Sequence, residues 1–243
     1  MSFYKQFKYV FAMQFLRNAG NLVFFSIIQI MISLGIVFGF SYLFSSPEPG
    51  TLLFLATGAP TIILVMTGLV ILPNQTITSK AEGYTEFIRT WPVNRAAIVA
   101  ADTLVWFLIT FPGMIISTIC AHFIFHPGYA ISWTVIPAIL LSALTCIGLG
   151  YGYSHALPPP GAMALSQILA FGALMFSPVN FPMDRLPQWL QAIHHILPIY
   201  SIAEVIRASM ASTTFVAEPW NYINLIIWCI LGYGGAIAIL NRK

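Results

Sequence analysis

The chain has 243 residues, of which 58% are hydrophobic and 7% are charged, and its mean hydropathy is +0.85. Soluble domains carry about 25% charged residues, so this composition excludes an ordinary soluble enzyme and indicates a polytopic membrane protein. We interpret the net charge of +3 as a signal of orientation in a membrane, not of nucleic-acid binding.

The first twenty residues do not resemble a membrane span. Their apolar side chains recur at the spacing of one helical face: Phe3, Phe7, Val10, Phe11 and Phe15. Because Lys5 and Lys8 lie off this stripe, residues 1–20 are predicted to form a helix along the membrane interface. The alternative is a frayed polar leader.

Six later segments reach or approach the roughly 20 apolar residues that a helix needs to cross a bilayer. They are Leu22 to Leu43, Leu52 to Leu72, Ile98 to Phe125, Trp133 to Tyr153, Ala162 to Phe176, and Tyr222 to Leu240. The predicted fold is therefore all-α, with six transmembrane helices in a single domain that spans residues 1–243. Pro112-Gly113 predicts a tilt or kink in the third span.

Basic residues fall mainly on one side of these spans. Eight lie before span one, between spans two and three, or after span six: Lys5, Lys8, Arg17, Lys80, Arg89, Arg95, Arg242 and Lys243. Arg185 and Arg207 fall on the other side. The positive-inside rule therefore predicts that both termini are cytoplasmic.

The most charged part of the chain is the 77–95 segment between spans two and three. Glu82, Glu86 and Arg89 follow at spacings of four and three, which predicts that they share one helical face. Pro92 is predicted to end this helix, and Asn94-Arg95 to open span three. A short charged helix of this kind suits docking to a soluble partner, and the alternative is a solvated loop with incidental ion pairs.

One acidic residue, Asp102, lies a turn inside span three, where an ionised group is costly unless it reaches the interface or a partner. We favour a snorkelling or paired carboxylate over a proton carrier.

After the fifth span, helix-breaking residues interrupt the chain between positions 177 and 210. Non-helical backbone cannot face lipid, so this stretch must be packed in protein or line water. Its candidate residues for an outer gate or translocation path are Pro178, Asn180, Pro182, Arg185, Glu204 and Arg207. Glu204 and Arg207 are three apart on a predicted helix, so the simpler interpretation is that they pair with each other.

Catalytic and metal-binding motifs are lacking. The sequence has no GxxxxGK[ST] P-loop, GxSxG or HExxH pattern, so we expect no catalysis by this chain. His122 with His126, and His194 with His195, supply only two ligands each, so we expect no metal site.

The complete pattern resembles the permease subunit of ABC-2 type ATP-binding-cassette transporters. Three stretches carry the resemblance: Phe15-Leu16-Arg17-Asn18, Lys80-Ala81-Glu82-Gly83-Tyr84-Thr85-Glu86 with Trp91-Pro92-Val93-Asn94-Arg95, and Phe176-Ser177-Pro178-Val179-Asn180-Phe181-Pro182 with Leu186-Pro187-Gln188-Trp189-Leu190. Gln29 within the first span and the bulky Trp91 depart from the family's pattern.

The resemblance implies a coupling helix in residues 77–95 that meets a separate ATPase, with re-entrant extracellular elements in residues 177–210. The candidate coupling residues are Lys80, Glu82, Glu86, Arg89 and Arg95. ATP and Mg²⁺ would be bound by the partner ATPase, and this chain would bind no cofactor. A second permease subunit would complete the path in a bacterial cytoplasmic membrane.

The expected function is ATP-driven export of a hydrophobic or amphipathic compound, such as a drug, an antibiotic peptide or a lipid-like molecule, by alternating access. The first alternative is an ABC-2 exporter of a glycan. The second is an ATPase-independent secondary transporter in which Asp102 and Glu204 couple to ions. A membrane enzyme that uses His194 and His195 is disfavoured, because no nucleophile accompanies them.

Overall fold

The computed structural model describes residues 2–43 and 49–241, and within them it is helical, with turns and one isolated bridge between Ala130 and Ala211. The helices are α1 (Phe3–Leu43), α2 (Pro49–Met66), the π turn η1 (Thr67–Ile71), α3 (Leu72–Ala81), α4 (Tyr84–Arg89), α5 (Arg95–Phe125), α6 (Val135–Ala156), α7 (Pro159–Phe171), the π turn η2 (Gly172–Phe176), the 3₁₀ turn η3 (Met183–Arg185), α8 (Gln188–Ile196), α9 (Pro198–Met210) and α10 (Pro219–Asn241).

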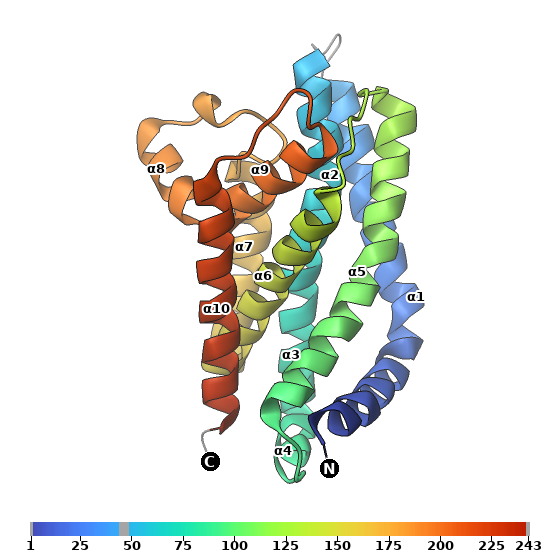
Figure 1. Cartoon of the computed structure of the whole chain (residues 1–243), viewed down its shortest axis with the longest axis vertical. Helices are drawn as coiled ribbons and strands as arrows, with labels where there is room; N and C mark the ends of the chain where they lie inside the picture. The colour runs from blue at the N-terminus through green and yellow to red at the C-terminus, as the bar shows by residue number, and fades with distance from the viewer. Residues whose placement is uncertain (1, 44–48, 242–243) are drawn as a thin grey trace.

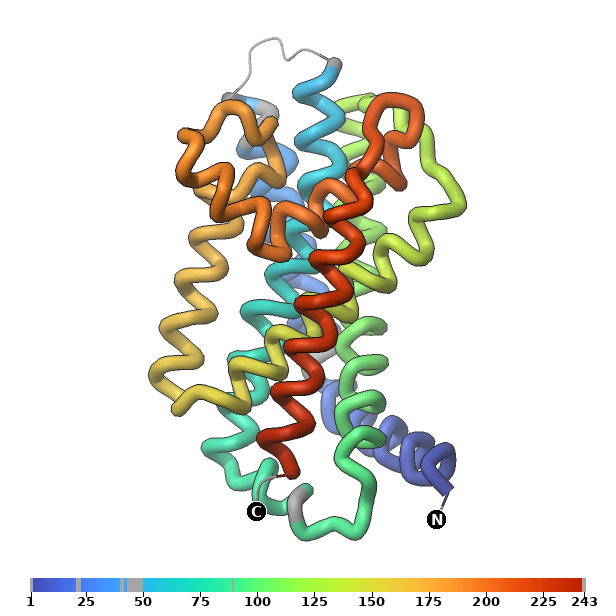
Figure 2. Tube along the Cα trace, turned by 60° about the vertical axis from the view of Figure 1, so that its left-hand side comes forward, coloured from blue at the N-terminus to red at the C-terminus, as the bar shows by residue number. Residues whose placement is uncertain are grey.

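The long helices run side by side along the long axis of a bundle (Figure 1). Both ends of the chain and α4 lie at one end of it, which we call the terminal end. Helices α8 and α9 lie near the opposite end, the far end, in both views (Figure 1 and Figure 2). The 77–95 and 177–210 segments are therefore at opposite ends of the molecule.

The described part of the structure has five to six candidate membrane spans, where six were predicted. Within the described residues, five helical stretches are long and apolar enough to cross a membrane: Gly50–Ala81, Arg95–Phe125, Val135–Ala156, Pro159–Phe176 and Pro219–Asn241. α1 adds a sixth if its two parts, Phe3–Gly20 and Val23–Gly39, which meet at 65°, are counted together as one bent span. This confirms an all-α polytopic membrane protein.

The N-terminal segment is helical, and it continues into the first span across this bend. Its apolar stripe packs partly against protein. Val10 is buried in a cluster with Ile88 of α4 and with Ile98 and Ala101 of α5, and Phe7 and Phe11 pack beside it. The stripe therefore holds the leader against the 77–95 segment, in addition to any contact with the membrane surface.

The second span is longer than predicted. Its helix does not stop near Leu72 but continues through the π turn and α3 to Ala81, 32 residues from Gly50. The hydroxyls of Thr76 and Thr78 in α3 are satisfied within the helix, because each donates to the carbonyl four residues earlier. We call this stretch, Gly50–Ala81, the central span.

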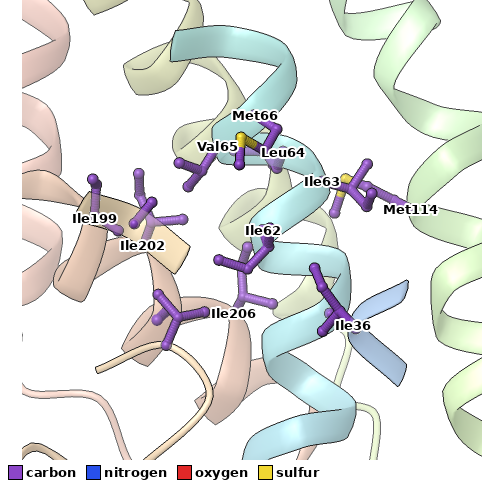
Figure 3. Close-up of a cluster of buried hydrophobic side chains, with 14 of the residues drawn as sticks. Ile36, Ile62, Ile63, Leu64, Val65, Met66, Met114, Ile199, Ile202 and Ile206 are labelled. Atoms are coloured by element: carbon purple, nitrogen blue, oxygen red, sulfur yellow. The ribbon is translucent and has the colours of Figure 1, made fainter. Parts of the chain in front are cut away.

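The central span lies in the middle of the bundle. In its most apolar window 89% of the residues are buried, and four consecutive side chains of α2 are inaccessible on all sides: Ile62, Ile63, Leu64 and Val65. Figure 3 shows them surrounded by isoleucines of α1 and α9 and by Met114 of α5. Because the packing is close, a displacement of the central span would also displace the helices that pack on it.

Close contact between α6 and α10 depends on glycines. A Cβ atom added at Gly232 would lie 2.6 Å from the carbonyl oxygen of Gly148, and one added at Gly152 would lie 3.0 Å from that of Gly232. Gly148 and Gly152 lie four residues apart on α6, and this small-residue face forms its contact within the chain. A Cβ added at Gly35 or Gly39 would meet no described atom within 4 Å outside its own helix.

Candidate functional site

The 77–95 segment contains a six-residue helix, α4, that leaves the central span through a tight reversal. Gly83 has φ 76°, in the left-handed region that glycine adopts without strain, and separates α3 from α4. As predicted, the segment is not helical at Pro92, and Asn94 caps α5 by accepting a hydrogen bond from the backbone N–H of Ala96 at 2.9 Å.

The predicted common face of Glu82, Glu86 and Arg89 is wrong, because the reversal at Gly83 takes Glu82 out of α4. Glu82 follows α3, and its carboxylate lies 3.6 Å from the Arg17 guanidinium. Glu86 is exposed in the first turn of α4. Arg89 ends α4, but its side chain lies outside the described part of the structure.

Two of the predicted coupling residues bind backbone groups inside the protein. Lys80 donates hydrogen bonds to the carbonyls of Ser154 and, at 3.2 Å, His155 at the end of α6. Arg95 donates to the Ile88 carbonyl at 3.1 Å. Positive side chains at carbonyl-rich helix ends stabilise those ends, so both residues position helices.

An exposed aromatic residue accompanies the acidic ones on α4. The Phe87 side chain is 57% exposed, with its ring edge-to-face against Trp91 at 5.3 Å. We call the exposed set Glu82, Glu86 and Phe87 the α4 surface. The sequence pattern did not indicate Phe87, because an aromatic residue in a short helix between two apolar spans is expected to be buried.

Arg17 links the N-terminal helix to α3 and α4. Its guanidinium lies 3.4 Å from the centre of the Tyr84 ring and donates to Ser79 Oγ at 2.8 Å. The Tyr84 hydroxyl donates to Gln14 Oε1 at 3.2 Å. Burial raises the pKa of Tyr84, against the effect of the Arg17 charge, so this hydroxyl stays protonated at neutral pH.

A cavity of about 60 Å³, lined by both polar and apolar side chains, adjoins Arg17, between α1, α3, α4, α5, α6 and α10. Asp102 lies on its wall and accepts a hydrogen bond from the Tyr151 hydroxyl, and Tyr151 in turn stacks on His155. Asp102 therefore has a hydrogen-bond partner inside the protein, and no ion pair of Asp102 is formed within the described residues. A cavity of this volume has room for a few water molecules.

At the far end, the broken segment packs tightly against the central span. Residues 177–180 are all buried, Pro178 and Asn180 among them. A Cβ atom added at Gly58 would overlap the Asn180 side-chain oxygen and lie 2.9 Å from the Val179 carbonyl oxygen. Only glycine permits this approach, so Gly58 is a site residue that a lone glycine in an apolar run did not reveal.

Arg207 of α9 joins three elements at this end and is only 1% exposed. It forms an ion pair with Glu204, and its Nη2 donates to the Val179 carbonyl at 2.6 Å. The guanidinium also lies 3.9 Å from the centre of the Phe54 ring of α2. The predicted pairing of Glu204 with Arg207 is thus confirmed, and we call Arg207, Glu204, Val179 and Phe54 the Arg207 cluster.

The other predicted residues of the far end do not join this cluster. Pro182 is half-buried before η3, and Arg185 is exposed. The two adjacent histidines diverge, because the His194 side chain is buried while His195 lies edge-to-face against Tyr200. Among the described residues, no three His, Cys, Asp or Glu side chains come together as metal ligands.

Comparison with known families gives one result. A family model described as ABC-2 type transporter matches residues 5–211, which include both the α4 surface and the Arg207 cluster. A comparison with curated proteins found no match.

Proposed function

This chain belongs to the ABC-2 type transporter family, and on that premise we propose that it is the permease subunit of an ATP-driven exporter of a hydrophobic or amphipathic compound. As a transmembrane subunit of that family it is not itself the catalyst. A separate ATPase subunit would bind ATP and Mg²⁺ and dock on the α4 surface.

The central span carries this proposal, because one continuous helix connects the two candidate regions. At the far end it presents Phe54 to Arg207 and Gly58 to Asn180. At the terminal end it presents Ser79 to Arg17. A displacement of α4 by a docked ATPase is thereby delivered to the far end, which is the transmission that alternating access requires.

The α4 surface is suited to receive that displacement. Exposed carboxylates around an exposed aromatic ring match the composition of protein interfaces, in which aromatic anchors are surrounded by polar groups. The contacts of Arg17 with Ser79, Glu82 and Tyr84 connect α1 to both α3 and α4. The ATPase would therefore move the first span together with the central span.

The Arg207 cluster is suited to act as an outer gate. A buried arginine is costly without its partner, so contact of Arg207 with Glu204 and the Val179 carbonyl would favour the closed arrangement until work is done on it. Cargo affinity must differ between the two arrangements for ATP to drive net movement. The gate would comprise Pro178, Asn180, Glu204 and Arg207, while Pro182 and Arg185 would border the exit.

The distribution of charged residues supports the proposed orientation and the proposed class of cargo. The terminal end carries most Lys and Arg residues, so it would face the cytoplasm of a bacterial cell with the far end outside. Few charges lie within the spans, which suits a hydrophobic or amphipathic cargo better than a highly hydrated one. A second permease subunit, identical or related, would complete the path.

Purification of the tagged chain in mild detergent tests the proposal directly. We expect a P-loop ATPase to co-purify, and hydrolysis by the reconstituted complex to rise with hydrophobic cations or amphipathic peptides. Stimulation only by lipid-linked oligosaccharides would favour glycan export. Transport that follows an ion gradient without any ATPase would contradict the proposal.

A further inference from the structure

Gln29 of α1 is a polar side chain buried among membrane spans, with 1% of its surface exposed. Its Nε2 donates two hydrogen bonds, to Thr67 Oγ1 at 3.2 Å and to the Ile109 carbonyl at 3.3 Å. One acceptor belongs to the central span and the other to α5. In an apolar environment such polar contacts are retained because neither water nor lipid replaces them.

The first contact falls where the central span departs from α-helical geometry. Thr67 begins the π turn, in which the Leu72 N–H bonds to the Thr67 carbonyl five residues back. π turns are uncommon and concentrate at functional positions. On the opposite side of the same turn, the Tyr153 hydroxyl of α6 donates to the Leu69 carbonyl. The turn is thus held by side chains from two neighbouring helices.

The second contact falls where α5 is weakened. Pro112 has no N–H, so one hydrogen bond of α5 is missing within a turn of Ile109. A Cβ atom added at Gly113 would overlap Gln29 Oε1 and lie 2.8 Å from Gln29 Cβ. The Gln29 side chain therefore occupies the space that glycine leaves beside the proline.

We propose that Gln29 is a positioning residue that links the π turn of the central span to the turn of α5 that contains Pro112, so that the two spans change shape together. The proposal rests on the transport function proposed above. It adds that displacement of the central span is passed to α5 near the middle of the bundle, through the Gln29 amide.

Unpaired polar atoms on the same face support a second arrangement of this interface. Gln29 Oε1, Ser33 Oγ of α1 and Ser117 Oγ of α5 are buried without a protein hydrogen-bond partner. An unpaired buried polar group is unfavourable, so three together favour a state in which α1 and α5 have shifted and these atoms find partners.

Two substitutions that retain the approximate shape of the original side chain remove the hydrogen bond between Gln29 and Thr67. Gln29→Met retains length without a hydrogen bond, and Thr67→Val removes only the acceptor hydroxyl. Thr61→Val is the matched control, because Thr61 is equally buried in α2 but bonds only to the Thr57 carbonyl of its own helix.

The experiment uses the full chain in nanodiscs, with Cys120, Cys146 and Cys229 replaced by alanine. One pair of spin labels spans the π turn of the central span, at Gly50 and Thr78, and a second pair spans Pro112 of α5, at Ala100 and Phe123. Distances are measured without nucleotide and, with the co-purified ATPase, with ATP. The ratio of cargo-stimulated to basal hydrolysis is measured in parallel.

We expect Gln29→Met to broaden both distance distributions without nucleotide and to abolish the ATP-dependent change in α5. The stimulation ratio should fall about fivefold or more, as expected for loss of coupling between sites. The Gln29→Met/Thr67→Val double variant should be no worse than Gln29→Met alone, since Gln29→Met already removes the contact that Thr67→Val removes. Thr61→Val should behave as the parent chain.

Outcomes that overturn this proposal are distinct from those that overturn the transport function. Unchanged distributions in Gln29→Met, or additive effects in the double variant, would show that Gln29 links nothing. Absence of any ATPase partner for the parent chain would contradict the proposed transport function, while the distributions without nucleotide still decide the role of Gln29.

Discussion

Arg207 donates a hydrogen bond from Nη2 to the carbonyl oxygen of Val179 at 2.6 Å, which attaches α9 to the broken segment that follows the fifth span. The two residues are 28 positions apart, and neither has its usual environment. The arginine is buried, and the carbonyl belongs to backbone without helical partners. Each group therefore satisfies the other, and this reciprocity explains why non-helical backbone is tolerated there.

Replacement of Arg207 by methionine is expected to destabilise the protein. It leaves the Val179 carbonyl and the Glu204 carboxylate without their partner, and loss of one member of a buried pair costs about 3–5 kcal/mol. The check is thermal unfolding of the detergent-purified chain. Arg185→Met, at an exposed position of the same segment, should change stability by less than about 0.5 kcal/mol. Equal effects of the two variants would argue against the Arg207 cluster.

Gly58→Ala is expected to displace the broken segment. The new methyl group would overlap the Asn180 side chain and press on the Val179 carbonyl, and overpacking of this kind costs about 1–3 kcal/mol. Gly35→Ala is the matched control in α1, where a Cβ meets no described atom within 4 Å and the helix loses nothing. Protease accessibility of residues 177–187 provides the measurement. Cleavage that does not differ between the two variants would contradict tight packing at Gly58.

Charge reversal at both Glu82 and Glu86 to lysine is expected to uncouple ATP hydrolysis from transport without unfolding the permease. Both side chains are exposed, and the contact of Glu82 with Arg17 is a surface ion pair worth about 0–1 kcal/mol. Transport and ATPase activity are measured together in proteoliposomes. Asp184→Lys, an exposed reversal at the far end, serves as the control. If the double variant retains full coupled transport, these carboxylates are not needed for docking of the ATPase.

Phe87→Ala is expected to weaken association with the ATPase about tenfold or more, as for an aromatic anchor at the centre of an interface. Stability should hardly change, because more than half of the side chain is already exposed. Affinity is measured with the permease in nanodiscs. Phe123→Ala, also exposed but at the other end of α5, should bind normally. If Phe87→Ala binds the ATPase with unaltered affinity, the ATPase does not dock on the α4 surface.

Hydropathy and helix-breaking residues predicted most of the fold. The apolar runs, the stop at Pro178 and the cap at Asn94 act over a few residues, so local sequence is sufficient to locate them. The π turn was not predictable, because its residues Thr67–Ile71 are as apolar as the α-helical turns around them.

The candidate site was predicted less completely, because its contacts join distant parts of the chain. Lys80 was grouped with its charged neighbours, yet its partner carbonyls lie 74 and 75 residues later in α6. The prediction that Glu82 and Glu86 share one helical face was wrong for a local reason. Helical spacing applies only within one helix, and Gly83 reverses the chain between the two residues. Glu204 and Arg207 were predicted correctly, because their spacing lies within one helix.

The π turn also determines the direction in which the side chains of α3 point, at the terminal end of the central span. A π turn contains one residue more than regular α-helical geometry, and each residue of a helix corresponds to about 100° of rotation. If the same residues Thr67–Ile71 adopted regular α-helical geometry, the extra residue would no longer be taken up by the wider turn, and α3 would rotate by about that angle. Lys80 would then point away from the end of α6, and Ser79 away from Arg17. The single extra residue thus sets the angular alignment of the two ends of the molecule.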